Sequence, residues 1–471
     1  MQKSRQEIYL IIFALILLVS PGFYASIAYG QDIEKRLSDL EETLKKQQET
    51  IKGQQNLIEG LKDELGKLKS AEAQGSTKPL PVTTTQEEGQ QKQPKSLSVG
   101  GLFGASSMLN PNISVVLNTY GYASQMTDST LKNRGIPGYY TNSQVTADMA
   151  NTRGFNLDSA ELYIFAPVDP YFNLYTTIPV TEDGVSIEEA YFTTTALPDG
   201  LQIKGGKFRS GFGRLNAQHS HVWSFVDAPL AYKAFTGSEG IDEKGVQVTY
   251  LPDLLIPLTI GAEALQGDND ILFGKDAESA PHAYTAFAKV SFDIGDDSTI
   301  LTGLSLISGK TRSNAIADNT IFVGNSTLYG VEFTYKWKPS RLSSLTLQSE
   351  YLLRSQSGDL TNETSLKISP LKRQQDGFYI QSAYQFGLWT WGVRYDRLGI
   401  FRDDFQRQGD LSQSFGNAPW RASTEMSLDL TEFSRLRLQY NYDRSGRDDK
   451  TNNELFLQVI LGIGAHGAHT F

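Results

Sequence analysis

Apolar residues alternate with polar or small residues along most of the chain, and the carboxy-terminal stretch shows this most clearly. Between Leu455 and Phe471 the odd-numbered positions are apolar except His469, and the even-numbered positions are smaller or more polar. A period of two predicts a β-strand with one apolar and one mixed face. The last strand of a transmembrane β-barrel has this pattern because its outer face meets lipid, although a soluble edge strand reads the same way.

The same period starts at residue 112 and continues to the end of the chain. It predicts an all-β transmembrane barrel of about 16 antiparallel strands, an even number within the bacterial range. The expected strands are 112–126, 153–167, 171–180, 185–195, 199–208, 241–251, 256–265, 283–294, 297–308, 326–337, 342–354, 375–386, 389–400, 419–430, 432–444 and 453–471.

The connections between these strands alternate between tight turns and long polar loops. The long loops are expected at 127–152, 209–240, 266–282, 309–325, 355–374, 401–418 and 445–452, with 181–184 as a short member of the same class. Outer-membrane barrels sort their connections in this way, with short turns on the periplasmic rim. Aromatic residues near strand ends, such as Trp337 and Trp389, fit interfacial girdles or the ordinary β-propensity of aromatic residues.

The first 111 residues precede the predicted barrel (112–471) and divide into three segments. Residues 1–30 have basic, apolar and small-residue regions in the order of a secretory signal peptide, with an uncleaved anchor as the alternative. Residues 31–70 carry apolar residues at heptad spacing, which predicts an α-helical coiled coil in the periplasm. This coiled coil is either a homo-oligomerisation stalk, for which a trimer is permitted, or a tether to another periplasmic partner. Residues 71–111 are polar and proline-containing, which predicts a flexible linker.

Composition removes several classes of protein. After the first thirty residues no apolar run approaches the roughly 20 residues of a spanning helix, so a helical membrane bundle is excluded. The chain has no cysteine, which excludes disulfides, thiolate metal sites and cysteine nucleophiles. Its formal charge of −10 argues against nucleic acid as a partner. No serine or threonine nucleophile with a positioned histidine is identifiable, so we expect neither an enzyme nor a cofactor.

The loop at 209–240 differs from the other long loops because it is rich in aromatic residues. Such a loop should pack against a surface, and the inside of the barrel is the nearest one. Folded inward, it would narrow the lumen, where charged side chains determine selectivity. The alternative is that these charges only pair with one another at the base of the loop. The candidate constriction residues are Lys204, Lys207, Arg209, Arg214, Asp227 and Lys233.

Four of the five histidines form two pairs, His219 with His221 and His466 with His469. In an extended chain the side chains of residues i and i+2 point the same way, which suits a divalent metal such as zinc. Asp227 is a candidate third ligand for the first pair. The alternative is that His219 and His221 are hydrogen-bonding loop residues and that His466 and His469 end the last strand.

Two resemblances accompany these patterns. The chain resembles porins of the phosphate-selective O/P type in two respects. One is the order of its segments: signal peptide, coiled coil, linker and barrel. The other is the run Gly205-Gly206-Lys207-Phe208-Arg209 before Gly211-Phe212-Gly213. That resemblance implies a sixteen-stranded trimer with an inward third loop. The stretch GFGRLNAQHSHVW also looks like a porin-like group sometimes linked to zinc supply.

These observations favour a porin in the outer membrane of a Gram-negative-type bacterium, in contact with lipid and assembled as a homotrimer. Its expected function is passive diffusion of small hydrophilic solutes or ions, with anions as one option, because about sixteen strands leave an aqueous channel. The alternatives are a zinc-associated uptake porin and a structural envelope anchor whose coiled coil binds a periplasmic partner.

Overall fold

A computed structural model describes residues 111–141, 145, 151–274, 277–313, 320–407 and 415–464. The predicted signal peptide, the predicted coiled coil and nearly all of the linker lie outside the described residues, as do His466, His469 and Phe471. No helix in the described part of the chain has the length and apolarity needed to cross a membrane.

The described strands form one antiparallel sheet that closes on itself, because the first strand pairs with the last. β4 and β5 both pair with β3 and are two pieces of one interrupted strand, so the barrel has sixteen strands. The strands are β1 (Asn112–Ser124), β2 (Gly154–Pro167), β3 (Phe172–Thr181), β4 (Gly184–Val185), β5 (Glu189–Thr194), β6 (Leu201–Arg209), β7 (Asp242–Tyr250), β8 (Leu258–Leu265), β9 (Ala283–Ile294), β10 (Ser298–Ser313), β11 (Thr320–Ser340), β12 (Ser343–Asn362), β13 (Ile368–Phe386), β14 (Trp389–Arg407), β15 (Trp420–Thr431), β16 (Ser434–Arg444) and β17 (Asn452–Gly464).

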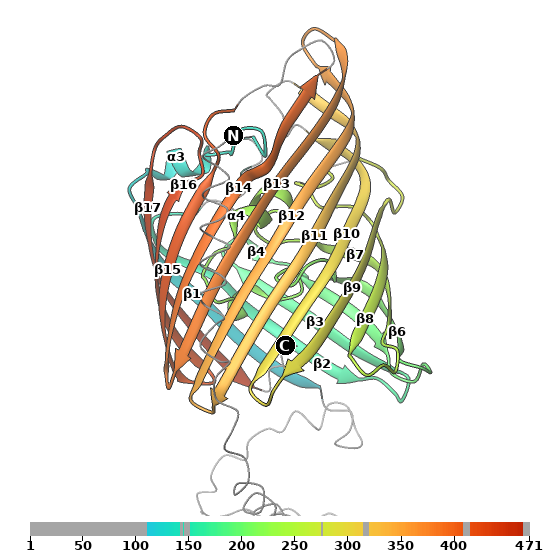
Figure 1. The fold of residues 1–471 in the computed structure, drawn as a ribbon, viewed down its shortest axis with the longest axis vertical. Coiled ribbons are helices and arrows are strands. Elements are labelled where there is room, and N and C mark those ends of the chain that lie inside the picture. Colours follow the sequence, from blue (N-terminus) through green and yellow to red (C-terminus); the bar gives the residue numbers. More distant parts are fainter. Residues whose placement is uncertain are drawn as a thin grey trace, which may run out of the picture. The chain divides into compact units, whose positions relative to one another are not determined.

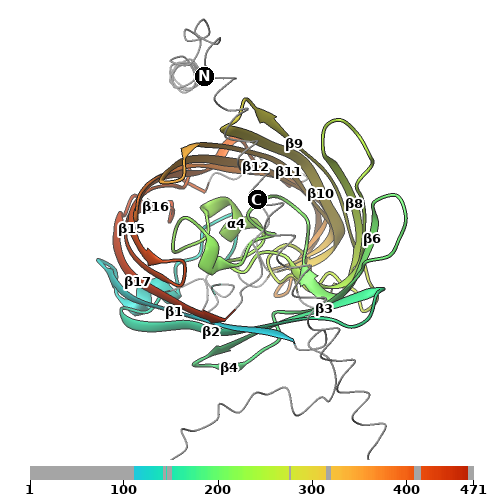
Figure 2. The same ribbon diagram turned by 90° about the horizontal axis from the view of Figure 1, so that it is seen from below.

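Closure depends on the register between β1 and β17. Ser114 lies opposite Gly464 and Ser124 lies opposite Glu454, so the two strands pair along nearly their whole length. The expected fold, a closed barrel of sixteen antiparallel strands, is confirmed. All sixteen expected strands are present, and Figure 2 shows them as a ring.

Two expected loops are wrong in large part. Most of 309–325 and 355–374 continues as paired strand, so that Thr320 lies opposite Asn362 on β11 and β12. In the expected loop 401–418, β14 continues as far as Arg407, and residues 408–414 lie outside the described part of the chain. Figure 1 shows these long strands projecting at the long-loop rim. Here the outer face also becomes polar, as at Asp359 and Lys372, and the apolar alternation that marks the rest of each strand is lost.

The outer face of the barrel is apolar and its inner face is polar, the reverse of a soluble barrel. Along β17, Leu455, Leu457 and Ile463 are exposed on the outside, whereas Glu454 and Gln458 are buried on the inside. The predicted faces of the last strand are therefore confirmed over its described length. An outer apolar surface of this kind matches the hydrocarbon region of a lipid bilayer.

Aromatic residues at the short-turn ends of the strands also face outward. Tyr171, Trp337, Trp389 and Trp391 are exposed there, as expected of an interfacial girdle. Other aromatic residues near the ends of strands face the lumen instead. Tyr122, for example, is buried and donates a hydrogen bond to Glu454 at 2.7 Å.

The hydrophobic core lies inside the barrel and is built from loops as well as strands. It is centred on the short helix α4 (Leu230–Phe235), which Figure 2 shows within the ring of strands. The loop after β1, which contains α3 (Asp128–Lys132), contributes Tyr139, and the loop after β8 contributes Phe273. Three long loops therefore turn inward and pack together.

The outward apolar face predicts a depth-dependent cost for charge. We expect Leu457→Arg, in the middle of β17, to destabilise the barrel by about 2–4 kcal/mol because it places a cation in hydrocarbon. Leu342→Arg is the matched control, since Leu342 is exposed in a turn at the short-turn rim and the same change should cost roughly 0–1 kcal/mol. Urea unfolding from lipid vesicles measures both values, and equal costs would contradict a lipid-facing β17.

Candidate functional site: the inward loop and its two histidines

Residues 210–241 connect β6 to β7 and are called the inward loop. They contain the short 3-10 helix η3 (Ser220–Val222) and α4. The aromatic side chains that set this loop apart in the sequence are all buried: Phe212, Trp223, Phe225, Tyr232 and Phe235. The prediction that the loop folds into the barrel is confirmed, because α4 packs against the inner faces of β12, β13 and β14.

Glu350 on β12 fixes the first turn of the inward loop. Its carboxylate accepts hydrogen bonds from the backbone N–H groups of Arg214 and Leu215 at 2.9 and 3.0 Å. It also accepts hydrogen bonds from the hydroxyls of Tyr232 and Tyr379 at 2.8 and 2.6 Å. This buried carboxylate therefore accepts hydrogen bonds from four donors, two of the loop backbone and two tyrosine hydroxyls.

Asp227 fixes the middle of the loop to the nearby strands β14 and β15. Its two carboxylate oxygens accept hydrogen bonds from Arg394 on β14 and Arg421 on β15, each at 2.6 Å. Asp396 lies on the far side of both guanidinium groups, 3.1 and 3.2 Å from their Nε atoms. Burial opposes ionisation of Asp227, but Arg421 and Arg394 outweigh it and lower the pKa of that carboxyl below its usual range.

The base of the inward loop is fixed at β5. Arg209 donates hydrogen bonds to Glu188 through its guanidinium group and to Glu189 through its backbone N–H. Two consecutive glutamates reach the lumen because the strand bulges: residues 186–188 face only two residues of β3 between the pairs Val180–Val185 and Thr177–Glu189. Bulges commonly redirect a side chain in this way.

His219 and His221 lie at the contact between the inward loop and this wall. The Nε2 atom of His219 is 2.9 Å from Glu189, and its Nδ1 atom is 3.6 Å from Glu161 on β2. The Nδ1 atom of His221 is 3.4 Å from the same oxygen of Glu161. Burial disfavours the imidazolium of His219, but the surrounding carboxylates raise the pKa of His219 well above its usual value.

The two histidines come together for a different reason than the one expected. His219 is the N-cap of the 3-10 helix η3 and His221 lies within it, instead of both lying in one extended segment, and their ring centroids are 5.7 Å apart. The expectation that Asp227 is a third ligand is wrong, because both of its oxygens are bound by arginines. Glu161 takes that position, and ligand atoms of Glu161, His219 and His221 lie within 4.8 Å of one another.

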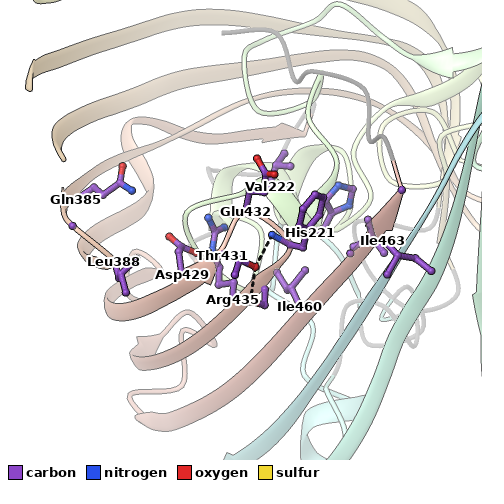
Figure 3. A pocket seen from close by; sticks show the side chains of 16 residues that line it. His221, Val222, Gln385, Leu388, Asp429, Thr431, Glu432, Arg435, Ile460 and Ile463 are labelled. Atoms are coloured by element: carbon purple, nitrogen blue, oxygen red, sulfur yellow. Dashed lines mark hydrogen bonds and ion pairs between the residues drawn. The ribbon is translucent and has the colours of Figure 1, made fainter. Parts of the chain in front are cut away.

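Two large cavities lie on the short-turn side of the inward loop. One has a volume of about 670 Å³ and is lined by Glu161, Arg209, Arg214 and His219 among other residues. The other has a volume of about 790 Å³ and extends to the turn between β15 and β16. Figure 3 shows His221 and Val222 at this second cavity, together with Asp429 and Arg435 of that hairpin.

The remaining candidate constriction residues are divided between different surroundings. Lys204 lines the 670 Å³ cavity, with its Nζ atom 4.8 Å from the ring centroid of Tyr191. Lys233 lines a cavity of about 60 Å³ on the long-loop side of the inward loop. Lys207 forms an ion pair with Asp242 at 2.7 Å and is not among the residues that line these cavities.

Several residues that fix the loop were not identifiable from the sequence. They are inward-facing strand residues scattered over the second half of the chain: Glu350, Asp396, Arg394, Arg421 and Arg437. Arg437 donates to the carbonyl oxygen of Trp223 at 2.8 Å, so it also binds the loop backbone. The sequence signal for these residues was a charged side chain at an inward position of an otherwise regular strand. Contact with water in the lumen explains such a charge as well as contact with the loop does.

Comparison with known proteins identifies one relative in sequence and several in structure. No family model matches the chain. An uncharacterized protein of Aquifex aeolicus (strain VF5) is 40% identical over 384 residues, which cover 77% of this chain and 80% of that protein.

The structural comparisons return outer-membrane channels and porins. The channel DcaP of Acinetobacter baumannii has a TM-score of 0.49 at 12% identity, covering 77% of this chain and 99% of that chain. An anion-selective porin of Comamonas acidovorans has a TM-score of 0.45 at 7% identity, covering 75% and 99%. The trimer form of OmpT of Vibrio cholerae has a TM-score of 0.46 at 11% identity, also covering 75% and 99%.

The ion pairs of Asp227 predict that Asp227→Asn loosens the inward loop. Removing one partner of a buried charge pair costs about 3–5 kcal/mol, so trypsin should cut the loop of the folded variant at Arg214 or Lys233 while the original chain resists. Asp253→Asn, at an exposed turn, is the control.

The lowered pKa of Asp227 also sets the pH dependence of this protection. A depressed folded pKa stabilises the protein above the unfolded value of about 3.9 and loses that contribution as the pH falls through the folded value. Protection should therefore persist at pH 5 and be lost only in stronger acid. Equal resistance of both chains at every pH would contradict this role of Asp227.

Proposed function

The chain belongs to one family with the uncharacterized Aquifex aeolicus protein, and we propose that it forms a water-filled outer-membrane channel for passive diffusion of small hydrophilic solutes or ions. The inward loop is its constriction. The observation that carries this proposal is the pair of cavities of about 670 and 790 Å³ beside the loop, within a closed barrel of sixteen strands. Barrels of about this strand number enclose an aqueous channel.

The charges beside the loop support a role in selecting ions. The 670 Å³ cavity is lined by more cationic side chains than carboxylates. The cations are Lys204, Arg209, Arg214 and Lys289, and the carboxylates are Glu161 and Glu189. Rings of charged side chains at a constriction determine ion selectivity. This lining favours anions as the preferred solutes. Lys233 and Asp227 would act on the long-loop side, where Asp227 holds the loop in place rather than meeting the solute.

The apolar outer face supports an outer-membrane location with lipid as the surrounding partner. A homotrimer is part of the proposal, because the predicted coiled coil at 31–70 needs partner helices. The coiled coil would then stand in the periplasm. The alternatives are the zinc-associated uptake porin, favoured by the cluster of Glu161, His219 and His221, and the envelope anchor.

Planar-bilayer recordings of the purified full-length chain test this proposal, and Ala217→Cys sharpens them. Ala217 is an exposed residue of the inward loop that lines the 670 Å³ cavity, and the chain has no other cysteine. We expect stepwise openings in groups of three, a reversal potential in a salt gradient that indicates anion preference, and a stepwise fall in current when a bulky methanethiosulfonate reagent reacts with the introduced thiol.

The matched control is Leu342→Cys, whose side chain is exposed in a turn outside these cavities. The reagent should leave its current unchanged. Single-step openings would argue against the trimer but not against the channel. Silence of the folded protein in the bilayer would contradict the channel and favour the structural anchor.

A further inference from the structure

We propose that Glu161, His219 and His221 bind a divalent transition-metal ion of the zinc type where the inward loop meets the wall of the barrel. Two ligands come from the loop and one from β2, so the ion would tie the constriction to the wall. This inference goes beyond the proposed function, because a barrel that conducts no solute could still bind the ion.

The spacing of the ligand atoms fits a small metal ion. Atoms bound to a tetrahedral ion at about 2.0 Å lie roughly 3.3 Å from one another. One oxygen of Glu161 is 3.6 Å from Nδ1 of His219 and 3.4 Å from Nδ1 of His221. An oxygen of Glu188 lies 3.5 Å from the same nitrogen of His219 and provides a fourth donor beside the three.

The orientation of His219 matches that of a metal-binding imidazole. Its Nε2 atom is hydrogen-bonded to Glu189, whereas its Nδ1 atom is buried and has no hydrogen-bond partner. Histidines that bind metals usually donate their second ring N–H to a carboxylate, which fixes the tautomer and turns the other nitrogen toward the ion. Glu189 is therefore a positioning residue, which orients the imidazole ring of His219.

The negative charge around the site also favours binding of a cation. Glu161, Glu188 and Glu189 converge on the histidines, and the guanidinium group of Arg209 pairs with Glu188. Asp158 adds a further carboxylate on β2, where a bulge leaves it without a partner residue on β1 and its side chain accepts a hydrogen bond from Asn118 at 2.7 Å. Carboxylates buried at this density are costly unless cations compensate them.

The chemistry of the donors selects among metal ions. Imidazole nitrogen with carboxylate oxygen suits zinc and its transition-metal neighbours, whereas calcium and magnesium prefer all-oxygen sites. The ion can reach the ligands from water, because Glu161 and His219 line the 670 Å³ cavity and His221 lines the 790 Å³ cavity.

Equilibrium dialysis of the folded full-length protein against micromolar Zn²⁺, after treatment with a chelator, tests the proposal. We expect one ion per chain, unaffected by excess Ca²⁺ or Mg²⁺, and intense visible absorption bands when Co²⁺ replaces Zn²⁺. The double variant His219→Gln/His221→Gln should lose both the ion and the Co²⁺ bands. Glu189→Gln should keep the bands with an affinity lower by about 10–100-fold.

Two variants separate this site from other histidines. His282→Gln changes a histidine that contacts Phe273 elsewhere in the barrel, and His466→Gln/His469→Gln changes the pair near the carboxy terminus. Both should bind one ion as the original chain does. Heat-dependent electrophoretic mobility identifies folded barrels, and Glu161→Gln replaces the double variant if that variant does not fold. Absence of binding to the original chain, or unchanged binding to the folded ligand variants, would overturn the proposal.

Discussion

Charged residues on the inner wall of the barrel bind the inward loop, and residues of that loop line both of the large cavities described beside it. Glu350 accepts hydrogen bonds from two backbone N–H groups and two tyrosine hydroxyls. Asp227 accepts hydrogen bonds from the guanidinium groups of Arg394 and Arg421. Each of these charges would be costly to bury alone. The charges of the wall are therefore compensated by the loop, and the loop is held in place by the wall. Together these contacts place His219 and His221 against Glu161.

Strand positions could be read from the sequence because lipid and water impose opposite requirements on alternate residues. On β17 the lipid-facing leucines marked the strand, and the structure has that strand and its faces as expected. The same reasoning failed at the long-loop ends of β11, β12 and β13, where Asp359 and Lys372 make the outer face polar as well. Without an apolar face, a paired strand has the composition of a loop.

The candidate site was predictable only in part, for a similar reason. The aromatic residues of the inward loop showed that it must be buried, and the spacing of His219 and His221 suggested a shared ligand. Their carboxylate partners were not identifiable, because Glu161 belongs to a strand some sixty positions away and Glu188 turns inward at a bulge that alternation cannot predict. Asp227 was the nearest acidic residue in the loop, but two arginines from distant strands bind it instead.

Hydrogen exchange of the folded, membrane-embedded protein tests most directly whether the wall holds the loop. Exchange rates report local opening, and segments with bonded, buried amides exchange slowly. Peptides covering residues 210–241 should exchange as slowly as those from β12 and β14, and far more slowly than peptides from the short turns. Exchange of the inward loop at the rate of the turns would contradict a fixed constriction and the site built upon it.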